Sequence, residues 1–428
     1  MAEIVSMAAP APGPDRAPCD PLQGRRILVG ISGSIAAVKL PLVVSALVQR
    51  GAQVRCVLTP SAAQLVSAPA LASLSRAPVA LDGDQWSHRE SRPLHIELAE
   101  WAELVLLAPL SATSLARWVH GLGDSLLASV LLATEAPVLA AAAMNTAMWQ
   151  SPGVARNWEA LQAFERVLPL GPTAGLLACD RQGAGRMAEP AALLLALDSL
   201  ALWGWRRDWA GQHLLVTAGP TREWLDPARC LTNPSTGRMG VLLAQAARLR
   251  GATVDLVHGP LAVDPAWLEG LRCHPISTGA ELQQRLGALQ PQATAIAMAA
   301  AVADHRPARP QAGKLEKSAL AEAMAAGWQE VPDLLQQLVA HRPAGQRILG
   351  FAAQSGDGLE QARLKFVRKG CDLLFANPID GPGAGFGAST NQGWLLGPGD
   401  RCQTLAPASK LAIAHQLLTA LLALGPTA

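Results

Sequence analysis

Along this chain an apolar strand pattern, a turn of small residues and an apolar helix pattern follow one another twice. In the first occurrence the apolar run Arg26–Ile31 leads into a turn at residues 32–34 and a helical pattern at Ile35–Gln49. A second apolar run, Gln53–Leu58, comes next. Parallel strands are usually joined through a helix, so this order predicts a βαβ unit and a parallel sheet. Later strands and helices of this sheet are predicted at residues 104–108 and 138–142, and after Ser111 and Asp124.

The pattern stops near residue 206 and then starts again. Tryptophans and arginines replace the apolar periodicity between Leu200 and Gly211. A strand pattern at His213–Ala218 and a helix pattern at Gly237–Arg250 follow. Further strands are predicted at residues 253–257, 293–299, 347–352 and 371–376. Because 428 residues exceed what one core usually holds, the sequence predicts an α/β protein with two consecutive doubly wound, Rossmann-like domains.

These patterns divide the chain into three segments. Residues 1–21 are rich in Ala and Pro and lack the basic start and apolar block of a signal peptide, so they are interpreted as a disordered tail. The two predicted domains are residues 22–205 and 206–428.

Charge and cysteine content limit the classes of function. The net charge of +2 gives no basic surface of the kind that binds nucleic acid or an anionic membrane. The seven cysteines are scattered and form no CxxC pair, which argues against a zinc site or a disulfide framework and favours the reducing cytoplasm. The long apolar stretch Leu126–Met144 contains Glu135 and Pro137, which predicts a buried helix followed by a buried strand in place of a membrane span.

Small and polar residues follow the predicted strands of the first half. Ser32, Gly33 and Ser34 lie between a strand and a helix N-terminus, where backbone N–H groups and the helix dipole favour a phosphate. A turn of this kind can also serve only to reverse the chain. The motifs farther along are centred on His95, Ser111, Thr113, Met144, Asn145 and Cys179.

Taken together, these motifs resemble the family of homo-oligomeric, flavin-dependent cysteine decarboxylases. The resemblance implies a flavodoxin-like flavoprotein domain with FMN as its cofactor. It also implies that His95 is the active-site base, that Asn145 holds the substrate carboxylate and that Cys179 is the acid. The residues expected to bind FMN are Ser32, Gly33, Ser34, Thr59, Ser111, Thr113 and Met144.

The chemistry that this resemblance implies needs such residue types. Departure of the cysteine carboxylate strands a carbanion, and FMN would store electrons temporarily so that the charge can delocalise onto sulfur as an enethiolate. A base, a carboxylate holder and an acid complete the set. Each residue alone has another interpretation, since His95 could be a core histidine, Asn145 a helix cap and Cys179 an inert thiol. The chain departs from the family at Ala142, where a proline is usual, and at Asp180, where a glycine is usual.

A longer signature opens the second half. It begins at residues 217–223 and continues through Asn233 to the turn Ser235, Thr236 and Gly237. This turn precedes a predicted helix, so its N–H groups form either an anion site for a phosphate or only a helix cap. Lys365 and Lys369 are four residues apart and therefore share one helix face, as a phosphate-binding pair or as a solvated basic surface.

This second signature is similar to that of the CTP-dependent phosphopantothenoylcysteine synthetases of bacteria. The resemblance implies a nucleotide-binding ligase domain in which Asp304 binds the nucleotide, Lys314 stabilises the phosphorus centre and Asn233 acts in the second half-reaction. Departures from the family occur at Glu316, Val331 and Gln354. The contacts with CTP are expected from Asp304, Lys314, Pro332, Asp333, Leu334, Leu335, Phe351, Lys365 and Lys369.

The two resemblances cover the chain beyond its N-terminal tail and identify it as a member of the bifunctional coenzyme A biosynthesis family. They imply that the second domain joins 4′-phosphopantothenate to cysteine through an acyl-cytidylate, with Mg²⁺ bridging the CTP phosphates. The first domain would then decarboxylate the product to 4′-phosphopantetheine. The family also implies a homo-oligomer, trimeric through the flavin domains and dimeric through the ligase domains.

Two other functions stay open at this stage. The protein could be a related FMN-dependent decarboxylase or transferase with another substrate and a degenerate ligase half, or a flavin-binding regulatory protein. Retention of His95, Asn145 and Cys179 argues against the regulator. Retention of Asn233, Asp304 and Lys314 argues against a degenerate ligase. Small molecules are the expected partners, with no nucleic acid and no membrane.

Overall fold

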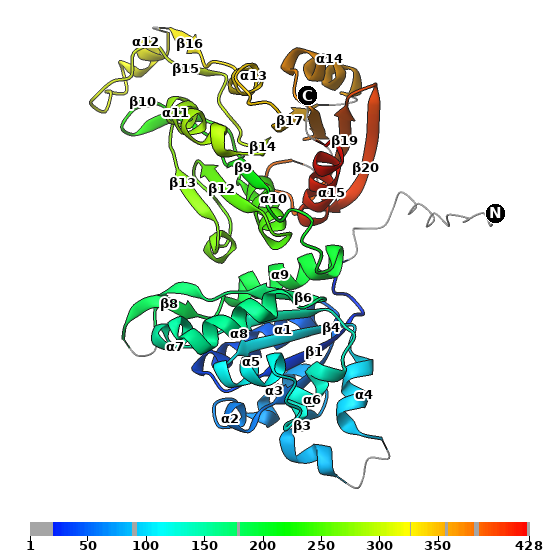
Figure 1. Ribbon diagram of the computed structural model, residues 1–428. Coiled ribbons are helices and arrows are strands. Elements are labelled where there is room, and N and C mark those ends of the chain that lie inside the picture. The colour runs from blue at the N-terminus through cyan, green and yellow to red at the C-terminus, as the bar shows by residue number, and fades with distance from the viewer. Residues whose placement is uncertain are drawn as a thin grey trace, which may run out of the picture.

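The computed structural model describes residues 20–87, 92–177, 180–325, 327–355, 358–380 and 385–425. Its two main sheets follow one another along the chain, and Figure 1 shows helix α9 running along the boundary between the two halves. Among the described residues, no helix has both the length and the hydropathy that a membrane crossing needs.

The first sheet has six parallel strands in the order β3-β2-β1-β4-β5-β6. Its strands are β1 (Arg26–Ile31), β2 (Gln53–Leu58), β3 (Val79–Leu81), β4 (Leu104–Leu110), β5 (Val138–Ala142) and β6 (Val167–Leu170). The chain runs outward from β1 in one direction and then resumes at β4 on the other side, so β1 and β4 form a switch point at which ligands typically bind.

Helices cover both faces of this sheet, as its unbroken apolar strands require. They are η1 (Ile35–Lys39), α1 (Leu40–Gln49), α2 (Pro60–Ala63), α3 (Ala68–Ser75), η2 (Asp82–Trp86), α4 (Leu94–Trp101), α5 (Ala112–Val119), α6 (Leu126–Ala133), α7 (Thr146–Gln150), α8 (Pro152–Gln162) and α9 (Pro190–Trp203). A small hairpin of β7 (Thr173–Leu176) and β8 (Gln182–Arg186) precedes α9.

The second sheet repeats this arrangement and extends it, in the order β13-β12-β9-β14-β17-β18-β19-β20. Its strands are β9 (His213–Ala218), β12 (Thr253–His258), β13 (Arg272–Pro275), β14 (Ala295–Met298), β17 (Arg347–Gln354), β18 (Leu373–Pro378), β19 (Thr390–Gly397) and β20 (Arg401–Ser409). The first six of these strands in sheet order are parallel, whereas β19 and β20 are antiparallel to their neighbours. The switch point here lies between β9 and β14.

The helices and hairpins of the second half complete the fold. The helices are α10 (Arg238–Leu249), η3 (Pro265–Leu268), α11 (Gly279–Leu289), η4 (Gln290–Gln292), α12 (Leu320–Ala325), α13 (Leu334–Ala340), α14 (Leu359–Lys369) and α15 (Lys410–Ala423). The hairpins are β10 (Arg222–Asp226) with β11 (Arg229–Thr232) and β15 (His305–Pro307) with β16 (Trp328–Glu330). In Figure 1, β15, β16 and α12 lie on the side of this domain that faces away from the first domain.

The predicted fold class is therefore confirmed, while several elements were not predicted. Two Rossmann-like sheets are present, and the strands β1, β2, β5 and β9 have the predicted bounds. The predicted helix at Ile35–Gln49 consists of a 3₁₀ segment followed by an α-helix. The sequence analysis did not predict the antiparallel strands β19 and β20 or the three hairpins.

Apolar packing crosses the predicted domain boundary. Leu195 of α9 is buried in the core of the second sheet, and Leu249 and Ala266 from the second half are buried in the core of the first. Each such side chain contributes up to about 2 kcal/mol by leaving water. The domain boundary between residues 205 and 206 therefore stays a prediction. In the folded chain, residues on both sides of this position contribute to both hydrophobic cores.

Polar groups reinforce this junction between α9 and α15. Ser199 Oγ and His415 Nε2 lie 3.0 Å apart, although 216 residues separate them in the sequence. The Arg250 guanidinium lies 3.8 Å from the centre of the Trp203 ring and makes two hydrogen bonds to the Asp208 carboxylate. Burial, together with the charge of Arg250, lowers the pKa of His415 to about 3, so this histidine is neutral in the folded protein.

Candidate active sites

The first candidate site lies at the carboxyl edge of the first sheet, where β1 and β4 end. Ser32 is fully buried. Its Oγ donates to the Pro109 carbonyl oxygen at 2.6 Å, and this Ser32 Oγ also accepts from the Ser111 N–H at 2.8 Å. The hydroxyl thus joins the turn after β1 to the turn after β4. This connection fixes the position at which the turn of residues 32–34 presents its backbone.

Small size is needed in this turn. A Cβ added to Gly33 would lie only 2.4 Å from the Cβ of Ser61, so a larger residue would push the turn away from the start of α2. The Thr59 hydroxyl caps α2 by accepting from Ala62 N–H, and Ser111 caps α5 by accepting from Ser114 N–H. Two helix starts and the β1 turn thus meet at one edge, an arrangement that fits the phosphate of a flavin mononucleotide.

Met144 and Asn145 follow β5 at the same edge. The Met144 N–H donates to the Gly185 carbonyl at 3.0 Å, which holds the β7–β8 hairpin against this segment. The Asn145 Oδ1 accepts from Met148 N–H at 2.8 Å and caps α7. Asn145 therefore has the helix-cap geometry that was its alternative interpretation, and its side chain is exposed at the edge of the sheet.

The remaining predicted residues of this site are placed differently. Thr113 is exposed in the first turn of α5, and His95 is half-buried in the first turn of α4. Among the residues that the structure describes, no hydrogen bond joins His95 to Asn145 or to the β1 turn. Cys179 lies outside the described residues. The catalytic roles of these residues stay predictions.

The second candidate site is a pocket of about 670 Å³ at the carboxyl edge of the second sheet, around the switch point between β9 and β14. Apart from Lys314, every residue predicted for the ligase reaction lines it: Asn233, Asp304, Pro332, Asp333, Leu334, Leu335, Phe351, Lys365 and Lys369. Residues from five separate segments of the sequence thus meet around one cavity of ligand size.

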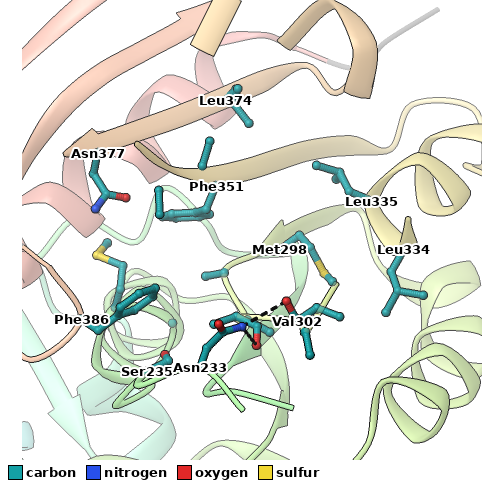
Figure 2. Close-up of a pocket in the computed structure, with 18 of the residues that line it drawn as sticks. Asn233, Ser235, Met298, Val302, Leu334, Leu335, Phe351, Leu374, Asn377 and Phe386 are labelled. Carbon is teal, nitrogen blue, oxygen red and sulfur yellow. Dashed lines mark hydrogen bonds between the residues drawn. The ribbon is translucent and has the colours of Figure 1, made fainter. Parts of the chain in front are cut away.

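Hydroxyl groups fix the segment that follows β14. The Thr217 hydroxyl accepts from Ala300 N–H, and the Thr221 hydroxyl accepts from Ala303 N–H, each at 3.0 Å. The Asn233 side-chain amide donates to the carbonyls of Ala301 and Val302 at 3.3 and 3.2 Å, as the dashed lines in Figure 2 show. Asn233 is thereby oriented by the stretch that leads to Asp304.

One part of the pocket is apolar. Figure 2 shows Phe351 between Phe386 on one side and Leu335 on the other. The ring of Phe351 packs edge-to-face on Phe375, with centroids 5.8 Å apart, which holds its orientation. A rigid aromatic ring in an apolar wall can take the flat face of a nucleotide base.

Another part of the pocket is cationic. Lys365, Arg368 and Lys369 reach it from α14, which confirms that the two lysines share one helix. Lys369 forms an ion pair with Asp333, and the other carboxylate oxygen of Asp333 caps α13. Asp333 therefore fixes the position of Lys369, which can still meet a phosphate from the pocket side.

Lys314 lies apart from this pocket. It is exposed in the segment between β15 and α12. Its neighbour Leu315 accepts from Arg229 through its carbonyl and donates its N–H to Asp226 Oδ2 at 3.2 Å, so the segment is held on the β10–β11 hairpin. The structure does not bring Lys314 together with the other predicted ligase residues.

Three cationic residues of the pocket were not predicted as site residues: Arg238, Arg368 and Lys410. Arg238 directly follows the turn of residues 235–237, so its place in the motif was a usable signal. Lys410 is the first residue of an otherwise apolar helix, and nothing local in the sequence distinguishes it from a surface lysine.

The side chains of the described residues form no metal centre, since no three His, Cys, Asp or Glu residues are placed to hold an ion. The free cysteines among them are also scattered, as Cys56, Cys230, Cys273, Cys371 and Cys402.

Two Rossmann-like domains in one chain, each with polar turns at the switch point of its sheet, define a two-site α/β protein of the flavin- and nucleotide-binding class. Residues 16–201 match the Flavoprotein family, and residues 209–424 match the family described as DNA/pantothenate metabolism flavoprotein C-terminal domain. The chain is 38% identical over 373 residues to the coenzyme A biosynthesis bifunctional protein CoaBC of Vibrio cholerae, covering 86% of this chain and 91% of the relative. It is 34% identical over 407 residues to the CoaBC protein of Bacillus subtilis, covering 94% and 98%. The chain belongs to the family of coenzyme A biosynthesis bifunctional proteins.

Solved structures match one half of the chain at a time. A PPC decarboxylase mutant complexed with pantothenoylaminoethenethiol is 33% identical, with a TM-score of 0.37, and the match covers 41% of this chain and 97% of that one. The C-terminal domain of a coenzyme A biosynthesis bifunctional protein CoaBC is 28% identical, with a TM-score of 0.42, and the match covers 50% and 98%.

Proposed function

We propose that this protein carries out two consecutive steps of coenzyme A biosynthesis. The second domain joins 4′-phosphopantothenate to cysteine at the expense of CTP, and the first decarboxylates the product to 4′-phosphopantetheine. The observation that carries the proposal is the pocket at the β9–β14 switch point, because it gathers Asn233 and, apart from Lys314, the predicted CTP-binding residues from five segments. Family membership across both domains supports the pairing of the two reactions.

The ligase reaction needs an activated carboxylate. A carboxylate oxygen of phosphopantothenate attacks the α-phosphorus of CTP, the bond to pyrophosphate breaks, and an acyl-cytidylate forms. Phe351 and the apolar wall would hold the base, while Lys365 and Lys369 would offset phosphate charge. Mg²⁺ would be bound through the phosphates, and Asp304 would contact the nucleotide.

The second half-reaction is an aminolysis. The cysteine amine attacks the acyl carbon and loses a proton as the amide forms, and CMP leaves with the electrons of the C–O bond of the mixed anhydride. Asn233, held by two backbone carbonyls, would position the acyl group for this attack. Lys314, which lies apart from the pocket in this structure, would have to reach it to offset charge on phosphorus in the first step.

The decarboxylase site would use FMN, held at the turn of residues 32–34 and by Thr59, Ser111, Thr113 and Met144. FMN supplies reversible storage of two electrons, which allows the thiol carbon to be oxidised before CO₂ is lost. His95 would take a proton from the substrate and Asn145 would hold its carboxylate. Cys179 would return a proton to the carbon that lost CO₂.

The partners proposed for this chain are small-molecule substrates and further copies of itself, as a trimer through the first domain and a dimer through the second. A cytoplasmic location accompanies this proposal. The related decarboxylase and the flavin-binding regulator named above remain the alternatives that an assay must separate.

The test is incubation of the purified chain with phosphopantothenate, cysteine, CTP and Mg²⁺, with products identified by mass. We expect CMP, pyrophosphate, CO₂ and phosphopantetheine, and yellow protein that releases FMN on denaturation. Omission of CTP should stop all products, whereas supplied phosphopantothenoylcysteine should restore CO₂ release. A chain that binds FMN but forms neither CMP nor CO₂ would be the regulator.

A further inference from the structure

Lys410 is a buried cation in the wall of the second-domain pocket. Only 4% of its surface is exposed, and its Nζ donates to the carbonyls of Gly385 and Phe386 at 3.3 Å each. Carbonyl oxygens solvate an ammonium group but bring no countercharge. No carboxylate of the described residues forms an ion pair with Lys410. A buried charge without an opposite charge is costly, and most such groups have a partner.

A second cation of the same pocket acts on Lys410 through its charge. Arg238 lines the same pocket from the first turn of α10, and its guanidinium lies over the Trp267 ring, 5.5 Å from the centroid. Burial, and then the charge of Arg238, lower the pKa of Lys410 to about 8. The neighbouring loop residues 385–389 carry no titratable side chain, so Arg238 is the charge that acts on Lys410.

Both cations are connected to the turn of residues 235–237, because Arg238 directly follows this turn and Lys410 is joined to it through Phe386. The Thr236 hydroxyl donates to the Phe386 carbonyl at 3.0 Å, and this is one of the two carbonyls that Lys410 contacts. Figure 2 shows Phe386 close to Ser235 on this side of the pocket. One carbonyl therefore connects the turn before α10 to the start of α15. This cluster belongs to different elements from Lys365, Arg368 and Lys369 on α14.

We propose that Lys410 and Arg238 form a binding site for one phosphate group of the ligand in this pocket. This inference rests on the proposed function, in which that ligand is CTP, and adds a phosphate subsite on α10 and α15. A phosphate supplies the countercharge that no described residue provides by an ion pair with Lys410. Its negative charge favours the ammonium form of Lys410, so binding takes up a proton from the buffer when the pH is above about 8.

The experiment is titration calorimetry of the full chain with inorganic pyrophosphate and with CTP, each with Mg²⁺, in two buffers of different ionisation enthalpy. At a pH of about 8.5 the wild-type protein should take up roughly half a proton or more per ligand, and at a pH of about 7 much less, because Lys410 is then already charged. Lys410→Met should weaken pyrophosphate binding about tenfold and abolish the uptake. Lys410→Arg should keep most of the affinity without the uptake, since an arginine does not titrate in this range.

Arg401→Met is the matched control, because Arg401 is an exposed cation on β20 outside the pocket. It should leave affinity and proton uptake unchanged. If Lys410 only held the loop of Gly385 and Phe386 in place, both Lys410 variants would unfold at lower temperature. Any proton uptake of the wild-type protein would then come from another group, so Lys410→Arg would keep it. That outcome, or wild-type pyrophosphate affinity in folded Lys410→Met, overturns the proposal.

Two safeguards keep the result decisive. If neither Lys410 variant folds, Arg238→Met tests the other member of the site, and wild-type pyrophosphate affinity in folded Arg238→Met overturns the proposal. CTP consumption by the wild-type protein is measured separately. If the wild-type protein consumes CTP normally and Lys410→Met binds pyrophosphate as tightly as the wild type, only the phosphate site is rejected. If pyrophosphate binding depends on Lys410 but the wild-type protein consumes no CTP, only the ligase function is rejected.

Discussion

Asn233 and Lys314 stand in different relations to the ligase pocket, and their predicted roles differ accordingly. Asn233 lines the pocket and is held by two carbonyls, whereas Lys314 is exposed on the segment before α12. We expect Lys314→Ala to reduce pyrophosphate release from CTP by about 100-fold, because a cation that offsets charge developing at phosphorus is lost. Asn233→Asp should still release pyrophosphate but convert the acyl-cytidylate slowly. Quenched-flow assays with labelled CTP measure both steps.

The matched comparison is Lys317→Ala, which removes an exposed cation from the same segment and should leave pyrophosphate release near the wild-type rate. Equal loss of pyrophosphate release in Lys314→Ala and Asn233→Asp would contradict the division of roles. Retained pyrophosphate release in Asn233→Asp also shows that the pocket has folded despite a carboxylate facing two carbonyl oxygens.

At the first site, His95 and Cys179 are predicted to act at opposite ends of the reaction. Cys179→Ser should still reduce the flavin and lose CO₂, since both steps precede protonation of carbon. A hydroxyl is a far weaker acid than a thiol, whose pKa is about 8.5 in model peptides, so the variant should accumulate the oxidised aminoenethiol. His95→Asn should leave the flavin oxidised and release no CO₂. Stopped-flow absorbance with product mass distinguishes the two, and full turnover by Cys179→Ser would rule out its acid role.

Residue by residue, the sequence could identify side chains that belong to contiguous motifs and could not identify those defined by burial. Phe351 and Asp333 each lie in a local pattern, so the family resemblance was enough to single out two residues that line one pocket. Lys410 is the first residue of α15, directly after β20, and lies far in sequence from Arg238. The proposed role of Lys410 depends on the absence of a nearby carboxylate among the described residues. This is a property of the folded chain that no local sequence pattern reveals.

Among the elements, strands buried on both faces were predictable and edge strands were not. β1 and β5 are continuous apolar runs bounded by small residues, so their bounds were predicted correctly. β19 contains Gly393 and β20 contains Pro407, residues that usually count against a strand. β20 is an edge strand of the sheet, where the missing N–H of a proline can be tolerated.

The short hairpins show the same limit. β15 and β16 have three residues each, and every residue of β16 is exposed, so neither carries an apolar period. Their pairing depends on contact with each other and with β10. The segment that carries Lys314 is consequently the part of the ligase site that the sequence could place least well.

At the scale of the whole molecule, the Trp203 cluster should hold the two domains together. The ring lies against Arg250 and stacks on His415, with centroids 5.9 Å apart. We expect Trp203→Ala to destabilise the junction by about 2–3 kcal/mol, because buried ring area and a desolvated cation–π contact are lost together. Urea unfolding, followed separately through bound flavin and through CTP consumption, should then give two midpoints that have moved apart.

Trp86→Ala is the control for that measurement. Trp86 is 82% exposed on η2, so its loss should change either midpoint by no more than about 0.5 kcal/mol. If Trp203→Ala and Trp86→Ala give the same unfolding curves, the junction does not couple the domains.

The exchange of Leu195, Leu249 and Ala266 between the two cores bears on how either half could be expressed by itself. A gene cut at the linker would leave α9 with an uncovered leucine on one product and an uncovered apolar patch on α10 and η3 of the other. Such patches promote self-association, so the separate products should precipitate unless these positions are made polar. Conversely, when both halves are part of one polypeptide, each half covers the apolar side chains that the other half would otherwise expose.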